Sequence, residues 1–308
     1  MAWQQLHLQC EKTDVDLAEA LLLEAGALSI MLDDAGDQPL FEPLPGESPL
    51  WDEVVLTGIF DATAENGSGQ AVEQLSHEIA AQVQASRIWL SAVEDKDWER
   101  EWMVHYQPIA CANNLWIVPE WLSPPVPEAT NIIMDPGLAF GTGYHATTRL
   151  CLDWLTEEKL RGKVVIDYGC GSGILGIAAL LLGADQVYAV DIDPQAVLAT
   201  KQNANRNDVS ERLLAFLPEE FEEYCANNSV TPVDIIVANI LAKPLLSLAP
   251  YFATLIAPKS RIVLAGLIES QTESVAEAYQ PYFVLDPKHA FTAHEDHHWQ
   301  RLSGTFTG

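Results

Sequence analysis

Residues 164–179 constrain the fold of this chain more than any other stretch of its sequence. A strand-forming run, Val164–Tyr168, is followed by a cluster in which every second residue is glycine, and a helix-forming run starts at Ile174. This order predicts a strand, a tight turn and a helix. Glycine lets backbone N–H groups approach a ligand closely, and such a turn delivers the ligand to a helix N-terminus, as in nucleotide-binding βαβ units.

The spacing of these glycines distinguishes two kinds of nucleotide site. Gly169, Gly171 and Gly173 form the pattern G-x-G-x-G, and Ile174 stands next. A site for a nicotinamide or flavin dinucleotide typically has G-x-G-x-x-G. The spacing therefore disfavours a nicotinamide-dependent oxidoreductase, which is the alternative from a different class of protein.

Two acidic residues are in register with this turn. Asp167 directly precedes it, where a carboxylate would repel a pyrophosphate but would suit the cationic end of a ligand. Asp191 ends the next expected strand, residues 186–191, about twenty residues past the turn, where a ribose diol is usually held. An adenosine that carries a cationic amino-acid sulfonium satisfies both carboxylates, so the sequence predicts a site for S-adenosylmethionine.

Charge is the outlying feature of the composition. The chain has 16 Lys and Arg against 44 Asp and Glu, a net charge of −28. Such a surface repels nucleic acid, so no nucleic-acid binding is expected, and it attracts basic partners. A solubility or salt adaptation explains most of this excess, and a basic protein substrate would add to it.

Cysteines and apolar runs indicate the compartment. The five cysteines are scattered, without a C-x-x-C pair, which argues against disulfides or a zinc knuckle and for a reducing cytoplasm. No apolar run approaches the ~20 residues that cross a bilayer, and the first residues lack a signal-peptide pattern. We expect a cytoplasmic protein that does not bind membranes.

The first 94 residues have a pattern of their own. Their hydrophobic periodicity predicts the order βαββαβ, which is typical of a ferredoxin-like α+β module. The expected strands are residues 3–8, 28–32, 53–60 and 86–93, and the expected helices end near residues 26 and 83. This stretch has no catalytic cluster, so we expect residues 1–94 to be a docking domain or a structural appendage.

A linking segment, residues 95–130, comes next. Aromatic residues at helical spacing in its charged first part predict a connecting helix over residues 94–106. The proline cluster at residues 123–127 marks the entry to the second domain, residues 131–308.

Residues 132–148 form the second unusual stretch, with three glycines and three threonines just before the glycine turn. Two interpretations are open. The stretch is either a helix start capped by Thr147 or Thr148, or a flap whose hydroxyls and backbone touch the cofactor. In the second interpretation, Phe140 and Thr142 are among the cofactor contacts.

Strand and helix patterns alternate beyond the glycine turn, which predicts an α/β fold with a doubly wound sheet and a final hairpin. Residues 233–241 are predicted to be a buried strand with a polar residue, Asn239, near its end. Ligands bind at the carboxyl ends of such strands, so Asn239 is a candidate site residue; its alternative role is to cap the following turn. The other expected strands are residues 213–217, 261–267, 282–285 and 299–306, and the other expected helices are residues 149–155, 193–205, 244–255 and 271–279.

Together these motifs resemble class I S-adenosylmethionine-dependent methyltransferases, and more narrowly the PrmA family of bacterial ribosomal protein L-eleven methyltransferases. The glycine turn is generic to the superfamily, whereas D-P-G-L-A-F-G-T-G-x-H-x-T-T, residues 135–148, is far more specific. The family has Pro where Ala146 stands here, and commonly Thr where Tyr144 stands. The resemblance extends over residues 167–175, 191–193 and 238–241 and covers nearly the whole chain.

The resemblance implies a Rossmann-like methyltransferase domain behind a ferredoxin-like substrate-recognition domain. It implies methyl transfer from S-adenosylmethionine to α-amino and lysine ε-amino groups of ribosomal protein L-eleven, a basic protein. By this likeness Thr148, Gly169, Asp191 and Asn239 contact the cofactor. The full set of expected cofactor contacts is Phe140, Thr142, Thr148, Asp167, Gly169, Gly171, Gly173, Asp191 and Asn239.

Methyl transfer to an amine is an in-line displacement in which the cofactor supplies the leaving group, so the protein mainly positions the nucleophile. The amine must be neutral, which an apolar pocket favours and a nearby carboxylate opposes. Asn239 is the expected catalytic residue, because its side-chain carbonyl would orient an amine N–H. His145 is either a proton acceptor or a hydrogen-bonded support for its loop.

No metal site is expected. The cluster at residues 294–298 is interpreted as a solvated turn, because adjacent residues on a strand point to opposite faces. Cys170 lies inside the glycine turn as filler without a partner that would activate it. Two further alternatives are a methyltransferase for lysines of another protein and a cofactor-binding protein without catalysis. A monomer is expected.

Overall fold

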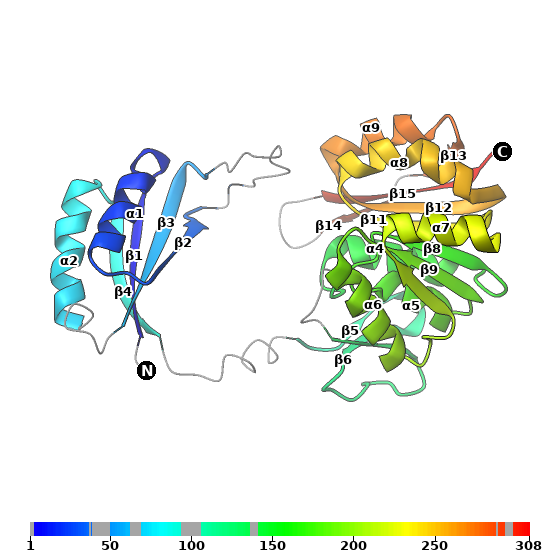
Figure 1. The fold of residues 1–308 in the computed structure, drawn as a ribbon, viewed down its shortest axis with the longest axis horizontal. Coiled ribbons are helices and arrows are strands. Elements are labelled where there is room, and N and C mark those ends of the chain that lie inside the picture. Colours follow the sequence, from blue (N-terminus) through cyan, green and yellow to red (C-terminus); the bar gives the residue numbers. More distant parts are fainter. Residues whose placement is uncertain are drawn as a thin grey trace. The chain divides into compact units, whose positions relative to one another are not determined.

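The structure, a computed structural model, describes residues 3–36, 38, 50–61, 69–93, 106–135, 141–287, 289–292 and 298–308. The chain divides into two compact units, Met1–Val104 and His105–Gly308 (Figure 1). The connecting helix expected over residues 94–106 lies almost wholly outside the described residues.

The first unit is a four-stranded antiparallel sheet with two helices on one face (Figure 1). Its strand order, β2-β3-β1-β4, confirms the expected ferredoxin-like βαββαβ module. Leu6 and Leu8 of β1 are fully buried and pack with Leu22 of α1. The elements are β1 (Trp3–Glu11), a 3-10 turn (Lys12–Asp14), α1 (Val15–Glu24), β2 (Ser29–Asp34), β3 (Glu53–Asp61), α2 (Gly69–Gln82) and β4 (Arg87–Val93).

The second unit contains an eight-stranded sheet whose order is β10-β9-β8-β11-β12-β15-β13, with β14 paired to β15. Strands β8 to β12 are parallel to their neighbours in this set, and β15 runs antiparallel between β12 and β13. The strands are β8 (Val164–Tyr168), β9 (Gln186–Val190), β10 (Leu213–Phe216), β11 (Val233–Asn239), β12 (Ile256–Ile268), β13 (Phe283–Leu285), β14 (His289–Thr292) and β15 (His298–Phe306).

Helices cover both faces of this sheet, which confirms the expected doubly wound α/β fold (Figure 1). One face packs against α4 (Ala146–Glu157), α5 (Ile174–Leu181) and α6 (Pro194–Arg206). The other face packs against α7 (Pro218–Asn228), α8 (Ala242–Leu255) and α9 (Glu269–Tyr279). Alternate residues of the central strands supply the two cores: Val165 of β8 belongs to the first and Ile166 to the second.

A small second sheet precedes α4 in the chain. It has the order β5-β6-β7 and packs beside α5 and α6. Its strands are β5 (Ile109–Ala110), β6 (Leu115–Pro119) and β7 (Thr130–Met134), with a 3-10 turn (Ala112–Asn114) after β5. Residues 105–130, expected to link two domains, therefore belong to the compact second unit.

The start of α4 differs from the sequence interpretation. The helix begins at Ala146, and its cap is His145, whose ring accepts a hydrogen bond from the Thr147 backbone N–H. Capping by Thr147 or Thr148 was therefore wrong, because both residues already lie inside the first helical turn. Helix α7 was not expected at all; only one of its residues, Phe221, is buried, so no apolar stripe marks it in the sequence.

Candidate cofactor and acceptor site

Three strand ends meet where the strand order of the large sheet reverses. β8 lies in the middle, β9 pairs on one side of it and β11 on the other. The glycine turn follows β8, Asp191 follows β9, and Asn239 ends β11. The carboxyl ends of parallel strands at such a reversal form the crevice in which these folds bind ligands.

The glycine turn has a backbone that only glycine adopts readily. Gly169, Gly171 and Gly173 have φ angles of 78°, 52° and 82°. The Gly169 N–H donates to the carbonyl of Val190, which ties the turn to β9 over 2.7 Å. A Cβ on Gly173 would lie 2.8 Å from a methyl carbon of Thr200, so α6 packs directly onto the turn. The sequence prediction of a tight strand–turn–helix unit is confirmed.

Asp191 braces this turn and still has acceptor capacity. Its Oδ2 accepts from the Gly171 N–H at 2.8 Å, and its Oδ1 accepts from the Asp193 N–H at 3.0 Å. A carboxylate offers about four lone-pair sites, so each oxygen can accept one further hydrogen bond. The half-buried carboxylate therefore fits the two hydroxyls of a ribose.

Asp167 lies near the end of β8, just before the turn, and is only 1% exposed. Its Oδ2 accepts from the Gly176 N–H at 2.8 Å, whereas Oδ1 is buried without a hydrogen-bond partner among the described residues. Burial raises the pKa of Asp167 to about 7; the Gly176 hydrogen bond opposes this rise, and the charge of Asp191 adds to it. Asp167 therefore stabilises the first turn of α5 through its hydrogen bond with the Gly176 N–H. Its contact with a cationic ligand stays a prediction.

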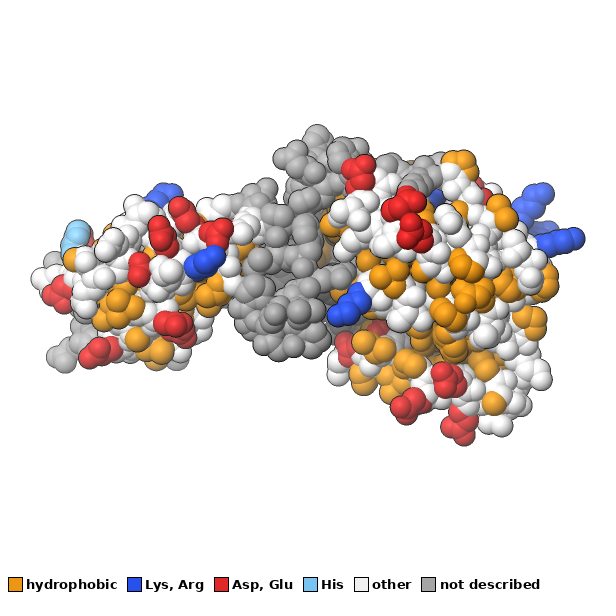
Figure 2. All heavy atoms as spheres, turned by 90° about the horizontal axis from the view of Figure 1, so that it is seen from above, with side chains coloured by type: hydrophobic (Ala, Val, Ile, Leu, Met, Phe, Trp, Pro, Cys, Tyr) orange, Lys and Arg blue, Asp and Glu red, His pale blue; other side chains and the backbone are white. Residues whose placement is uncertain are grey.

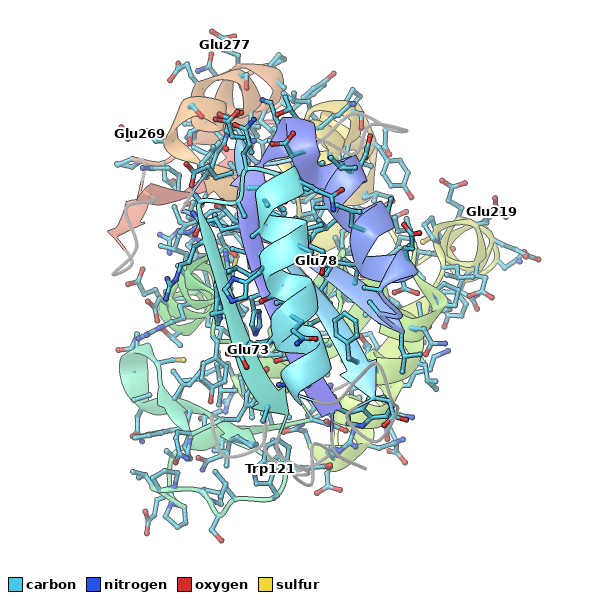
Figure 3. The ribbon with its side chains drawn as sticks, turned by 90° about the vertical axis from the view of Figure 1, so that its left-hand side faces the viewer. Glu73, Glu78, Trp121, Glu219, Glu269 and Glu277 are labelled. Carbon is cyan, nitrogen blue, oxygen red and sulfur yellow. The ribbon has the colours of Figure 1, made fainter. Side chains whose placement is uncertain are left out.

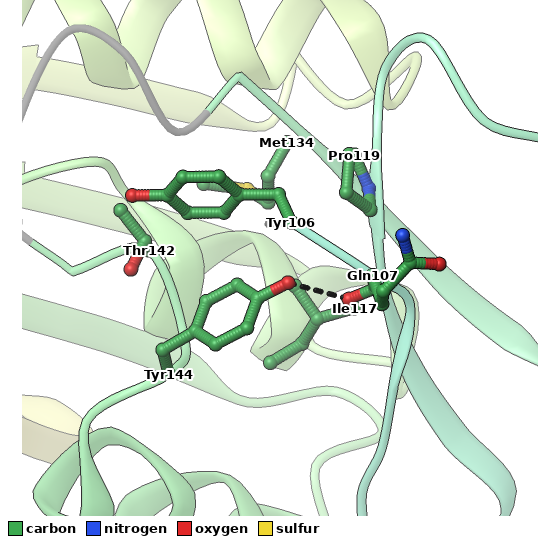
Figure 4. Close-up of a pocket in the computed structure, with 7 residues that line it drawn as sticks. All are labelled: Tyr106, Gln107, Ile117, Pro119, Met134, Thr142 and Tyr144. Carbon is green, nitrogen blue, oxygen red and sulfur yellow. Dashed lines mark hydrogen bonds between the residues drawn. The ribbon is translucent and has the colours of Figure 1, made fainter. Parts of the chain in front are cut away.

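The flap, residues 132–148, is described except for residues 136–140, so Phe140 lies outside the described residues. Ser172 Oγ of the glycine turn donates to the Gly141 carbonyl at 2.6 Å, which joins the flap to the turn. Thr142 lines a pocket of about 10 Å³ (Figure 4), which is room for about one water. Beside it, Tyr144 donates its hydroxyl to the Gln107 carbonyl at 2.6 Å. Cofactor contacts of Phe140 and Thr142 stay predictions.

Asn239 and Thr148 come together, as expected for residues of one site. Asn239 Nδ2 donates to Thr148 Oγ1 at 3.3 Å, and Thr148 is 1% exposed in the first turn of α4. None of the described residues donates a hydrogen bond to Asn239 Oδ1. The side-chain carbonyl of Asn239 can therefore accept from a substrate N–H while its amide nitrogen is held in place.

Two glycines hold the residue that follows Asn239. A Cβ on Gly169 would lie 2.1 Å from Cγ2 of Ile240, and a Cβ on Gly266 would lie 2.3 Å from the Ile240 carbonyl oxygen. Gly266 has a φ of 87° and lies in β12, where the pairing with β15 shifts register. Real Cβ atoms do not approach this closely, so the position of the Asn239 turn depends on glycine at both places.

His145 and Cys170 have structural contacts. The His145 ring accepts from the Thr147 N–H, bonds its hydroxyl at 2.7 Å and lies edge-on to Trp299, with ring centroids 4.5 Å apart. This favours the loop-support interpretation of His145. Burial raises the pKa of the Cys170 thiol well above its usual value, which makes the thiol unreactive.

The described ranges contain no group of three or more His, Cys, Asp or Glu side chains that could hold a metal ion, and residues 293–297 lie outside them. In the same ranges, no helix combines the length and apolarity needed to cross a membrane.

Helix α6 supplies site residues that were not recognised from the sequence. Thr200 Oγ1 donates to the Gly171 carbonyl at 3.0 Å, and Asn203 Nδ2 donates to the Ser172 carbonyl at 2.8 Å. Both are almost fully buried. One feature of the sequence could have revealed them: Thr200 and Asn203 are polar residues at positions where the helical periodicity predicts apolar ones.

The fold and this site define a class I S-adenosylmethionine-dependent methyltransferase. The family model described as ribosomal protein L11 methyltransferase (PrmA) matches residues 2–307. The chain therefore belongs to the PrmA family.

Individual relatives agree with this assignment. A protein of Psychrobacter cryohalolentis named ribosomal protein L11 methyltransferase is 81% identical over 308 residues, which is all of both chains. A protein of Acinetobacter baylyi with the same name is 53% identical over 306 residues, 99% of this chain and 98% of the relative. A crystal structure of a ribosomal protein L11 methylase from Lactobacillus delbrueckii subsp. bulgaricus has a TM-score of 0.56 and 30% identity, and covers 66% of this chain and 100% of that one.

Proposed function

We propose that this chain transfers methyl groups from S-adenosylmethionine to the α-amino and lysine ε-amino groups of ribosomal protein L11. The observation that carries the proposal is that Asp191 and Asn239 both lie at the carboxyl ends of the parallel strands, after β9 and at the end of β11, in a chain that matches the PrmA model over residues 2–307. The cytoplasm, where ribosomes assemble, is the proposed place of action, and a monomer is the proposed form.

When bound, the cofactor supplies an electrophilic methyl group and its own leaving group. The residues of the chain bind and orient. Asp191 and the glycine turn hold the adenosine, and Asn239 Oδ1 accepts an N–H of the neutral amine so that the nitrogen lone pair faces the methyl group. Thr148 keeps the Asn239 amide in the orientation that this requires. Orientation of this kind contributes most to a displacement that needs little other chemistry.

The first unit is proposed to dock the protein substrate. Residues 1–104 contain 4 Lys and Arg against 21 Asp and Glu, so this third of the chain has a net charge of −17 out of −28. Acidic side chains lie on the surface in both units (Figure 2). A protein that binds ribosomal RNA must neutralise phosphates with basic side chains, so its charge complements this unit.

The test uses the full chain, purified L11 and isotopically methyl-labelled S-adenosylmethionine. Mass spectrometry of L11 should show label at its N-terminus and at lysines, and Asn239→Ala should abolish most of it. The same reaction in a ribosome-free extract shows which proteins compete. Label on other proteins with none on L11 would replace the proposal by the alternative, a lysine methyltransferase for a different substrate.

A further inference from the structure

Arg301 of β15 is a buried cation without an ion-pair partner among the described residues. It is 5% exposed, and its Nη1 donates to the Leu150 carbonyl of α4 at 2.9 Å. Its Nε is buried and has no hydrogen-bond partner in the part of the chain that the structure describes. A guanidinium stays charged at neutral pH, and a buried charge is costly unless it is paired. One hydrogen bond to a helix carbonyl does not account for this cost.

Arg301 lies on the same face of the large sheet as the Asn239 side chain. Asn239 bonds Thr148 Oγ1 and Arg301 bonds the Leu150 carbonyl, so both side chains contact the first half of α4. Asn239 pairs with Ala265 of β12, and the residues on either side of Arg301 pair with β12 on either side of that level. Because neighbouring strands lie about 5 Å apart, Arg301 is two strands, or roughly 10 Å, from Asn239.

The strand order places Arg301 opposite the carboxylates of the cofactor site. β11, which ends at Asn239, has β8 and β9 with Asp167 and Asp191 on one side, and β12 and β15 on the other. The intervening part of β12, residues 262–268, contains no ionisable side chain. Two further ionisable side chains stand at the starts of neighbouring helices: Lys243 of α8 and His145, the cap of α4. Neither of them adds a negative charge.

The charges that act on Arg301 itself lie mostly farther along α4. Burial lowers the pKa of Arg301. Four groups oppose this effect: Cys151, Glu157, Asp153 and Asp286. Burial raises the pKa of the Cys151 thiol to about 12, so the thiol is neutral, and Asp286 is paired with Arg261. The other two carboxylates belong to the second half of α4, whereas the contact with Asn239 is in its first turn.

We propose that the charge of Arg301 keeps the acceptor amine at Asn239 neutral, so that its lone pair is free to attack. A positive charge disfavours the protonated form of a nearby amine, whereas the net charge of the chain, −28, favours it. The neutral nitrogen forms a bond to the methyl carbon as the carbon–sulfur bond breaks, and the sulfonium becomes a neutral thioether. The new ammonium then loses its proton to water. This inference rests on the methyl transfer to amines proposed above.

The test measures kcat against pH for the full chain, saturated with L11 and labelled S-adenosylmethionine. The acid limb of this profile reports ionisations in the enzyme–substrate complex. Arg301→Gln removes the charge but keeps an N–H for the Leu150 carbonyl. At roughly 10 Å and an effective dielectric constant of about 20, loss of a unit charge should move the acid limb up by about one pH unit. The rate near neutral pH should therefore fall about tenfold, while the plateau at high pH stays unchanged.

Two further variants separate charge from structure. Arg301→Lys keeps the charge and should restore the profile of the unmodified chain. Arg212→Gln removes a guanidinium that also donates to a backbone carbonyl, that of Ala184 at 2.9 Å. Arg212 directly precedes β10, at the amino end of a strand on the edge of the sheet, so its loss should leave the acid limb in place. A plateau that falls without movement of the acid limb, or equal movement in Arg212→Gln, would overturn the proposal.

A second neutral variant and a direct titration cover the case in which Arg301→Gln does not fold. Arg301→Met should show the same shift, because Met fills buried space without charge. In the unmodified chain with S-adenosylhomocysteine, NMR of L11 that carries one isotope-labelled methyl group per target amine reports the protonation of the bound amine. This amine should lose its proton at a lower pH than in free L11, and an equal or higher midpoint would contradict the role of Arg301.

Failure of this inference is distinguishable from failure of the proposed function. If the unmodified chain labels another protein and leaves L11 unlabelled, the proposed substrate is wrong. The pH profiles of the Arg301 variants are then measured on that other protein. The same movement of the acid limb there would support the role of Arg301, and its absence would overturn it.

Discussion

The two compact units differ in what their polar side chains bind. In the second unit, buried polar side chains bind the backbone of the site: Thr200 and Asn203 bind the glycine turn, and Asp167 binds the first turn of α5. In the first unit, the side-chain network on the sheet joins side chains to one another, as when His7 bonds Thr57 and Ser91. That unit has more than half of the net charge of the chain.

Buried contacts and surface charges affect the reaction in different ways. Short buried contacts fix the geometry of the site, and this geometry determines the rate constant of the reaction. Salt screens such buried contacts only little. Surface charge acts over distance, which changes encounter with a charged partner and weakens as salt is added. Substitutions in the second unit should therefore change kcat or cofactor affinity, whereas those in the first should change KM for the protein substrate.

The largest effect is expected at Asn239. Asn239→Asp keeps an acceptor oxygen but adds a charge that favours the protonated, unreactive amine. We expect kcat near neutral pH to fall about a hundredfold, as when one oriented group of an active site is lost, and the pH–rate profile to move to higher pH. Asn228→Asp on exposed α7 adds the same charge away from the site and is the control. A wild-type rate and profile would mean that Asn239 only shapes the turn.

Gly266→Ala tests whether a displacement of the Asn239 backbone alone lowers the rate of methyl transfer. Its Cβ would displace the Ile240 backbone and with it the neighbouring Asn239. A displacement of the order of 1 Å costs about tenfold to a hundredfold in rate. Gly162→Ala is the matched control, because Gly162 has a similar φ of 77° but no atom within 4 Å of its Cβ position. Steady-state kinetics in which both variants lose the same rate would attribute the effect to backbone strain.

Asp191→Ala should mainly change cofactor affinity. Loss of the ribose acceptor should weaken S-adenosylmethionine binding by at least about tenfold, or about 1.4 kcal/mol, measured by calorimetry. Asp193→Ala next to it removes the cap of α6, where the Gln195 N–H binds, and should lower stability without this loss of affinity. Tight binding of NAD by the unmodified chain would revive the oxidoreductase interpretation.

The smallest effect is expected in the first unit. Glu73 and Glu78 are exposed on α2, and Glu269 and Glu277 are exposed on α9 (Figure 3). Neutralising the first pair to Gln should raise KM for L11 about twofold to threefold at low salt, and the difference should vanish at high salt. The second pair loses the same charge and should change KM less. Equal changes would remove the division of roles between the units.

Local patterns in the sequence predicted more of the cofactor side than of the acceptor side. The glycine turn and Asp191 follow from residue types within one βαβ unit, where periodicity and turn chemistry act over a few residues. The contact of Gly266 with Ile240 depends on the pairing of β11 with β12, which no local pattern encodes. Asn203 was missed for a similar reason, because its partners, Asp135 and Ser172, lie in two distant segments.

The position of β15 has a consequence for the order in which the chain can fold. This strand follows every other strand of the large sheet in the sequence, yet it lies inside the sheet between β12 and β13 (Figure 1). During synthesis, the N–H and carbonyl groups along one edge of β12 stay unpaired with β15 until that strand has been made. The large sheet is therefore completed only after β15 has been made, whereas the first unit, whose described strands all precede residue 94, can fold ahead of it.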